Sequence, residues 1–92
     1  MQTEELKKAA ENGDAVAQYN LAVRLGEGTD AEKDAAAAAF WLEQAARKGH
    51  ISAQYNLALC YETGDGVKKD AKKSAYWYEQ AARQGDADAQ YN

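Results

Sequence analysis

The sequence predicts an all-α fold built from repeated pairs of helices, and three observations carry this prediction. The 92 residues include no proline, and the apolar residues recur at helical rather than alternating spacing. The tetrapeptide Ala-Gln-Tyr-Asn begins at residues 17, 53 and 89, an interval of 36 residues both times. Aligning residues 17–52 with 53–88 without a gap gives 18 identities in 36 positions, so a 36-residue repeat organises the chain.

The first helix of each repeat, called the first-type helix below, is predicted over residues 15–25 and again over 51–61. A glycine at position 13 or 49 precedes it and suits the left-handed end of the helix before. Aspartate is preferred at the N-cap of a helix, where its side chain accepts a backbone hydrogen bond. The predicted N-caps are Asp14, Asp86 and, as a weaker one, His50.

The second-type helix of each repeat follows an aspartate, Asp34 or Asp70, that can serve as its N-cap. It is predicted to run through a tryptophan and to end at Arg47 or Arg83, just before the next glycine. Glycines in the loop between the two helices permit a positive backbone φ at little cost. These loop glycines are Gly26, Gly28, Gly64 and Gly66.

The repeat divides the chain into parts of one domain that covers residues 1–92. Leu6, Ala9 and Ala10 match Leu42, Ala45 and Ala46, so the chain opens on a lone second-type helix. The predicted parts are this helix at 1–13, a first full repeat at 14–49, a second at 50–85 and the truncated start of a third at 86–92.

The residues that recur at the same position in each repeat predict a packed core. Trp41 and Trp77 each have an alanine four residues later on the same helix face, which suits close helix packing. We therefore expect the two tryptophans to pack in the core and not to form a platform on which nucleic-acid bases stack. Two stripes with i, i+4, i+8 spacing should face neighbouring helices: Ala17, Leu21 and Leu25, then Ala53, Leu57 and Tyr61.

Composition excludes several classes of function. A formal net charge of -4 argues against a nucleic-acid partner, because phosphate binding needs a concentrated basic face. The lysines at 68, 69, 72 and 73 are offset by Asp65 and Asp70 and read as a solvated surface. No apolar run is long enough for a membrane span or a leader peptide, so no membrane partner is expected and the localisation stays unknown.

The sequence contains few of the residues that catalysis or metal binding would need. His50 is the only histidine and Cys60 the only cysteine, so neither a structural zinc site nor an internal disulfide is predicted. Cys60 lies late in its helix, where the helix dipole opposes a thiolate. Neither Ser52 nor Ser74 is followed three residues later by lysine. The sequence therefore predicts no enzyme, no metal and no cofactor.

A family resemblance lies in motifs with fixed order and spacing. These are Ala-Gln-Tyr-Asn-Leu-Ala from residue 53, Gly-Asp-Gly-Val from 64, Lys-Asp at 69–70 and Ala-Tyr-Trp-Tyr-Glu-Gln-Ala-Ala from 75. Over essentially the whole chain the sequence resembles the Sel-one-like repeat (SLR) family. The resemblance implies a right-handed α/α solenoid related to tetratricopeptide repeats, with first-type helices along the concave face. One departure is the first loop, residues 26–32, whose sequence is less typical.

The resemblance also implies a function, because family members typically act as adaptors that assemble other proteins. The partner is then a protein or peptide bound on the concave face. The candidate binding residues are Tyr19, Asn20, Val23, Tyr55, Asn56 and Leu59. The repeated asparagines could bond a partner's backbone, or could tie their own helix to a neighbouring loop. The alternative function is a structural or engineered repeat fragment that forms a homo-oligomer through its uncapped ends by stacking or helix exchange.

Overall fold

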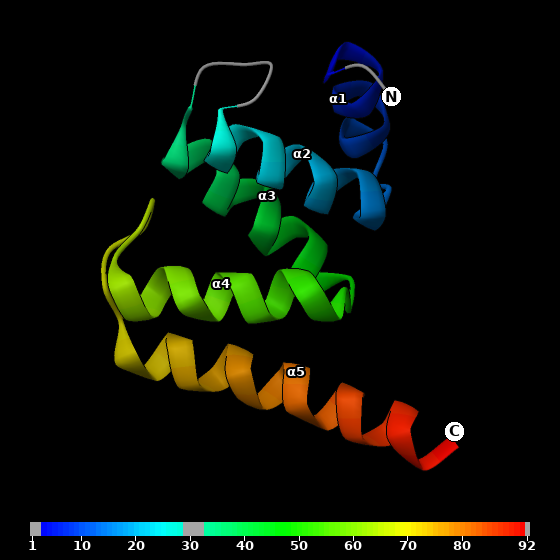
Figure 1. Cartoon of the computed structure of the whole chain (residues 1–92), viewed down its shortest axis with the longest axis vertical. Helices are drawn as coiled ribbons and strands as arrows, with labels where there is room; N and C mark the ends of the chain where they lie inside the picture. Colours follow the sequence, from blue (N-terminus) through cyan, green and yellow to red (C-terminus); the bar gives the residue numbers. More distant parts are fainter. Residues whose placement is uncertain (1–2, 29–32, 92) are drawn as a thin grey trace.

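The computed structural model describes residues 3–28 and 33–91, with side chains described as far as residue 85. Five helices follow one another along this part of the chain. They are α1 (Thr3–Glu11), α2 (Ala15–Glu27), α3 (Ala35–Arg47), α4 (Ile51–Thr63) and α5 (Ala71–Tyr91). Each helix packs mainly on its neighbours in sequence, so the layers succeed one another from α1 to α5 (Figure 1). The predicted all-α solenoid of helix pairs is confirmed, and its repeats follow the 36-residue period.

The turn that leads into each first-type helix is built in the same way twice. Gly13 and Gly49 take positive φ values of 97° and 91°. The next residue caps the new helix: Asp14 accepts a hydrogen bond from the Ala17 amide, and His50 Nδ1 accepts one from the Ala53 amide. Both predicted N-caps are therefore confirmed.

A buried glutamine braces each of these turns. Gln18 Nε2 donates to the Ala10 carbonyl and Gln54 Nε2 to the Ala46 carbonyl, each at 3.0 Å. Both glutamine side chains are almost fully buried, so each bond satisfies a polar group that water cannot reach. This explains why Ala-Gln recurs in the repeated tetrapeptide.

The loops after the first-type helices also repeat. Gly28 and Gly64 end α2 and α4 in the left-handed conformation and donate to the Arg24 and Cys60 carbonyls. In the second loop Gly66, at φ 75°, lies directly against the backbone at the start of α3. The second loop thus contacts the preceding repeat and helps fix the spacing between the two.

Small residues and leucines fill the core between successive helices. Leu57 is fully buried and clusters with Leu42 and Ala46 of α3, while Leu6 and Leu21 join α1 to α2. Trp41 and Trp77 are partly buried and pack against this core, which confirms the predicted packing role. The exposed neighbours Phe40 and Tyr76 meet the tryptophans edge to face.

Helix boundaries differ from the sequence prediction in two places. Both first-type helices run two residues further than predicted, so Gly26 lies inside α2 and not in the loop. The larger difference is that α5 continues through Gly85 to Tyr91, where a turn after Arg83 and a new helix capped by Asp86 were predicted. The part of the first loop at 29–32 lies outside the described residues.

The continuity of α5 has a physical reason in this chain. At Gly13 and Gly49 the turn is stabilised by a complete first-type helix, which packs on the core and supplies the bracing glutamine. Residues 86–91 form no separate helix of this kind and continue α5. Extending α5 gains one backbone hydrogen bond per residue, whereas a new helix needs a costly nucleus.

Replacing Gly85 with alanine should therefore stabilise the chain by up to about 1 kcal/mol, since alanine is the better residue inside a helix. Nothing lies within 4 Å of a Cβ built at this position. Urea unfolding followed by circular dichroism measures the change. The matched variant Gly49→Ala should lose about 1–2 kcal/mol, because position 49 has positive φ. A loss of stability in Gly85→Ala would indicate a turn at 85.

Candidate protein-binding face

The six predicted binding residues lie on α2 and α4, but they are not equally accessible. Asn20, Tyr55 and Leu59 are exposed, while Tyr19, Val23 and Asn56 are partly buried. The structure therefore divides the predicted set into residues that face solvent and residues that contribute to the packing between the two helices.

Tyr19 and Asn56 join the two first-type helices. Asn56 Nδ2 donates to Tyr19 Oη at 3.3 Å, and the Tyr19 ring stacks on His50 with the ring centroids 4.6 Å apart. His50 in turn caps α4. Asn56 thus bonds a helix of the preceding repeat, neither of the two roles weighed for it from sequence. These contacts fix α4 relative to α2.

A hollow of about 210 Å³ lies between α2, α3 and α4 and is called the inter-helix hollow below. Its lining includes the small or apolar side chains of Ala22, Ala38 and Leu42, which are buried. Val23 and Asn56 of the predicted set also line it, and so do the charged residues Glu27, Lys33 and Asp65 together with Cys60. The hollow therefore combines a partly apolar lining with charges of both signs.

Cys60 is half-buried in the wall of this hollow. Desolvation raises the pKa of its thiol above the usual value of 9.0, and the nearby carboxylate of Asp65 raises it further. Both causes disfavour the thiolate, which is the nucleophilic form. Cys60 therefore contributes a small, apolar and polarisable surface to the hollow at neutral pH.

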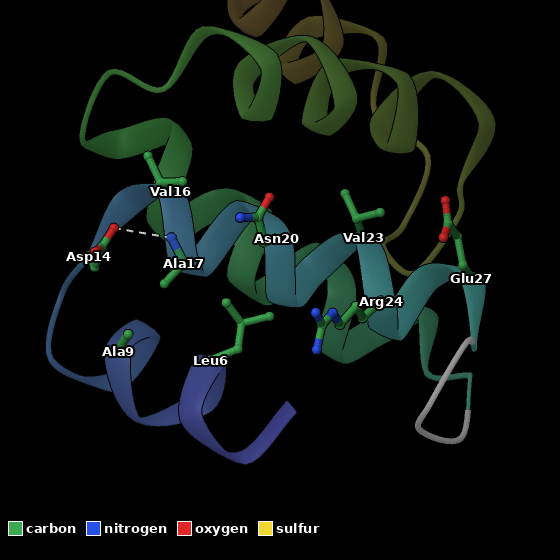
Figure 2. Close-up of a pocket in the computed structure, with 9 residues that line it drawn as sticks. All are labelled: Leu6, Ala9, Asp14, Val16, Ala17, Asn20, Val23, Arg24 and Glu27. Atoms are coloured by element: carbon green, nitrogen blue, oxygen red, sulfur yellow. Dashed lines mark hydrogen bonds between the residues drawn. The ribbon is translucent and has the colours of Figure 1, made fainter. Parts of the chain in front are cut away.

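A second, larger groove of about 490 Å³ runs between α1 and α2. Figure 2 shows Leu6 and Ala9 rising from α1 toward α2, with Asn20 and Val23 along one side of α2. Arg24 lies between the two helices and donates to Thr3 Oγ1 at 3.3 Å. Val23 lines both this groove and the inter-helix hollow, so the two form neighbouring parts of one surface.

Tyr55 and Leu59 lie further along the solenoid, on α4. Tyr55 is 58% exposed and meets Tyr78 of α5 edge to face, with the centroids 5.2 Å apart; Leu59 is 49% exposed. Of their counterparts 36 residues earlier, Tyr19 contacts His50 and Asn56, and Val23 is partly buried and lines the inter-helix hollow. Tyr55 and Leu59 are thus more exposed than the residues at the same positions of the first repeat.

Sequence reasoning missed part of this surface. Glu27, Lys33 and Cys60 line the inter-helix hollow although none was singled out as a binding residue. Helical spacing could have indicated one of them. Cys60 follows Asn56 by four residues, so the two side chains lie on the same face of the helix. Lys33 could not be placed from sequence because it lies in a loop whose path depends on tertiary contacts.

Within the described ranges, 3–28 and 33–91, no group of three or more His, Cys, Asp or Glu side chains is placed to hold a metal ion. None of the helices found there is both long and apolar enough to cross a membrane.

Comparison with known proteins identifies the repeat. The sequence profile of the Sel1 repeat matches residues 6–14, 15–50 and 51–86, most of the chain. The chain belongs to the Sel1 repeat family. The two longer matches agree with the two helix pairs, α2 with α3 and α4 with α5. A search of curated protein sequences found no significant match.

Solved structures of Sel1-repeat proteins share the fold. A protective antigen of uropathogenic Escherichia coli with an SLR fold is 39% identical, with a TM-score of 0.87, over 92% of this chain. A Sel1 repeat protein from Oxalobacter formigenes is 32% identical (TM-score 0.81), and cysteine-rich protein B of Helicobacter pylori is 25% identical (TM-score 0.86), each over 90% of this chain. The chain spans 18%, 33% and 62% of these three structures respectively.

Proposed function

We propose that this Sel1-repeat domain is a non-catalytic protein-interaction scaffold that binds an extended peptide segment along α2 and α4. Sel1-repeat proteins are generally protein-interaction scaffolds. The observation that carries the proposal here is the inter-helix hollow, which lies beside the α1–α2 groove and shares Val23 with it. A segment of another protein that crosses α2 can contact both.

The lining of the hollow suggests the chemistry of the segment. Ala22, Ala38 and Leu42 form an apolar lining that suits one apolar side chain, because burial of apolar surface supplies affinity without fixed direction. Glu27 and Asp65 can pair with a basic residue of the segment. The exposed Asn20 amide can both donate to and accept from an extended backbone. We expect a dissociation constant on the order of micromolar for so short a groove.

The single histidine and the single cysteine of the sequence are both in surroundings that support a non-catalytic function. His50 uses Nδ1 to cap α4 and stacks its ring on Tyr19. The raised pKa of Cys60 leaves it as a thiol at neutral pH. His50 stabilises the start of α4, and Cys60 packs against the core. Neither residue is therefore placed to act as a general base or a nucleophile.

Self-association through the ends is the other function that the repeat allows. It needs a first-type helix whose apolar stripe is available to a second copy. In the described chain the stripe of α2 packs on α1, and the stripe of α4 packs on α3. A second copy would have to displace one of these helices, so this observation favours the scaffold.

The proposal is tested with peptides selected from a phage-displayed random 12-residue library against the immobilised chain. Selected peptides should lose at least tenfold in affinity for the double variant Asn20→Ala/Val23→Ala, measured by fluorescence polarisation. A tenfold loss corresponds to about 1.4 kcal/mol of binding free energy. The matched control Phe40→Ala removes an exposed aromatic ring outside both hollows and should bind normally.

Circular dichroism establishes that the double variant is folded before its affinity is compared. Enrichment of no peptide, or equal binding by the folded double variant, would contradict the proposed site.

A further inference from the structure

His50 occupies a position at which the sequence otherwise has aspartate. The residues 36 positions before and after it are Asp14 and Asp86. Asp14 caps α2 by accepting a hydrogen bond from the Ala17 amide at 3.1 Å, and His50 Nδ1 accepts one from the Ala53 amide, also at 3.1 Å. The two caps therefore make the same bond with different chemical groups, a carboxylate in α2 and an imidazole in α4.

The imidazole can cap α4 only while Nδ1 carries no proton. A neutral imidazole has one donor and one acceptor nitrogen, whereas a charged one has two donors and no acceptor. Because Nδ1 accepts from the Ala53 amide, the proton of the neutral His50 ring lies on Nε2. A second proton, on Nδ1, would set two N–H groups against each other and remove the cap. Histidine takes up such a proton between about pH 8 and pH 5, a range in which a capping aspartate stays ionised.

The surroundings of His50 supply no counter-ion for a charged ring. Among the residues that the structure describes, no carboxylate forms an ion pair with it. The first two turns of α4, residues 51–58, contain no charged side chain. The charged residues at the adjoining ends of α2 and α3 are bonded elsewhere: Asp14 to the Ala17 amide, Arg47 to Glu43 and Lys48 to the Gly13 carbonyl. A charge on His50 would also add to the partial positive charge at the N-terminus of α4, which is unfavourable.

The His50 ring also forms part of the contact between α2 and α4. It stacks on the Tyr19 ring, the titratable side chain of α2 that it touches, with the ring planes 20° apart. Tyr19 Oη accepts a hydrogen bond from Asn56, further along α4. Tyr19 is therefore held through its ring by the residue that caps α4 and through its hydroxyl by a residue within α4. Any movement of the His50 ring acts on the same tyrosine that Asn56 binds.

We propose that His50 is a pH-sensitive switch for the contact between α2 and α4. The neutral ring caps α4 and stacks on Tyr19 at the same time. Stacking on Tyr19 tolerates a charged ring but does not restore the lost acceptor, so on protonation either the first turn of α4 leaves the ring or the ring leaves Tyr19. Each of these movements displaces Asn56, which lines the inter-helix hollow. The switch acts on the α2–α4 contact whether or not the hollow binds a peptide.

The pH dependence of stability is the first test. Thermal unfolding of the intact chain is followed by circular dichroism at pH 7.5 and pH 5.5, beside the variant His50→Asp, which carries the same capping residue as α2. The cap exists only without the second proton, so its contribution to stability is present at the higher pH and lost as the pH falls. The midpoint of the unchanged chain should fall by at least about 4 °C more than that of the variant. His50→Asn is a second control, because asparagine caps a helix without titrating.

Nuclear magnetic resonance of the isotope-labelled chain locates the effect. As the pH is lowered, the Ala53 backbone amide and the Asn56 side-chain amide should shift with the same midpoint as the His50 ring protons. In His50→Asp both amides should keep their chemical shifts over this range. The Ala17 amide is the internal control and should not move with His50, because Asp14 holds it.

Two results would overturn the proposal. One is an equal fall of the unfolding midpoint in the unchanged chain and in both variants, since the cap would then not depend on the charge of residue 50. The other is an Asn56 amide that stays fixed, or that titrates with a different midpoint from the His50 ring. In that case the ring would not be coupled to the contact between α2 and α4.

Discussion

Replacing Leu57 with alanine is expected to lower the free energy of unfolding by about 3–5 kcal/mol. The side chain is 0% exposed and lies at the centre of the cluster formed by α3 and α4, with Trp77 of α5 packed against the same cluster. Because successive layers contact mainly their neighbours, a cavity here weakens the junction between the two repeats. A loss of this size is a large part of the total stability of a domain of 92 residues.

Urea unfolding followed by far-ultraviolet circular dichroism measures this loss. Leu59→Ala is the matched control, because the same substitution two residues later removes a side chain that is 49% exposed. It should cost less than about 1 kcal/mol. Equal losses for the two variants would contradict the assignment of Leu57 to the core.

Gly66→Ala is expected to cost about 2–4 kcal/mol, for two physical reasons. Position 66 has φ 75°, a conformation that disfavours any residue with a Cβ by about 1–2 kcal/mol. The added Cβ would also overlap the backbone carbonyl of Ala35, with its carbonyl carbon only 2.6 Å away. Backbone atoms cannot rotate aside, so the loop or the start of α3 has to move.

The same unfolding experiment measures the Gly66 variant. Asp65→Ala is the control, since it changes an exposed residue of the same loop and should stay within about 0.5 kcal/mol of the unchanged chain. A Gly66→Ala variant as stable as the control would show that the loop does not rest on α3.

Much of the fold follows from the sequence because the signals are local and occur twice. Asp14 and Asp34 cap helices as predicted, and Gly13 and Gly49 take the predicted positive φ. The period then places equivalent residues at equivalent depths, as Leu21 and Leu57 show.

The errors arise where tertiary context decides between local alternatives. Glycine is typical of loops, yet Gly26 lies in the last turn of α2. The free-energy cost of a glycine inside a helix is about 1 kcal/mol, small enough for tertiary packing to override. At Gly85 the local signal for a turn resembles that at Gly49, yet residues 86–91 continue α5 and form no separate helix. Such a difference depends on packing and cannot be read from the glycine itself.

The candidate site was predictable by helix face but not by role. The six residues named from sequence do lie on α2 and α4. The roles of Tyr19 and Asn56 depend on a contact between residues 37 positions apart, and sequence spacing within one helix does not reveal it. The charged lining at Glu27 and Lys33 escaped prediction because the sequence placed both residues in the loop after residue 25, and loop residues have no periodic signal; Glu27 in fact ends α2.

The location of a bound peptide is the most direct test of the scaffold proposal. Backbone amide chemical shifts of the isotope-labelled chain would be recorded by nuclear magnetic resonance while a selected 12-residue peptide is added. The proposal predicts the largest changes at Asn20, Val23 and Cys60, which line the two hollows along α2 and α4. Changes concentrated instead around Phe40 and Tyr76, on the second-type helices, would contradict it.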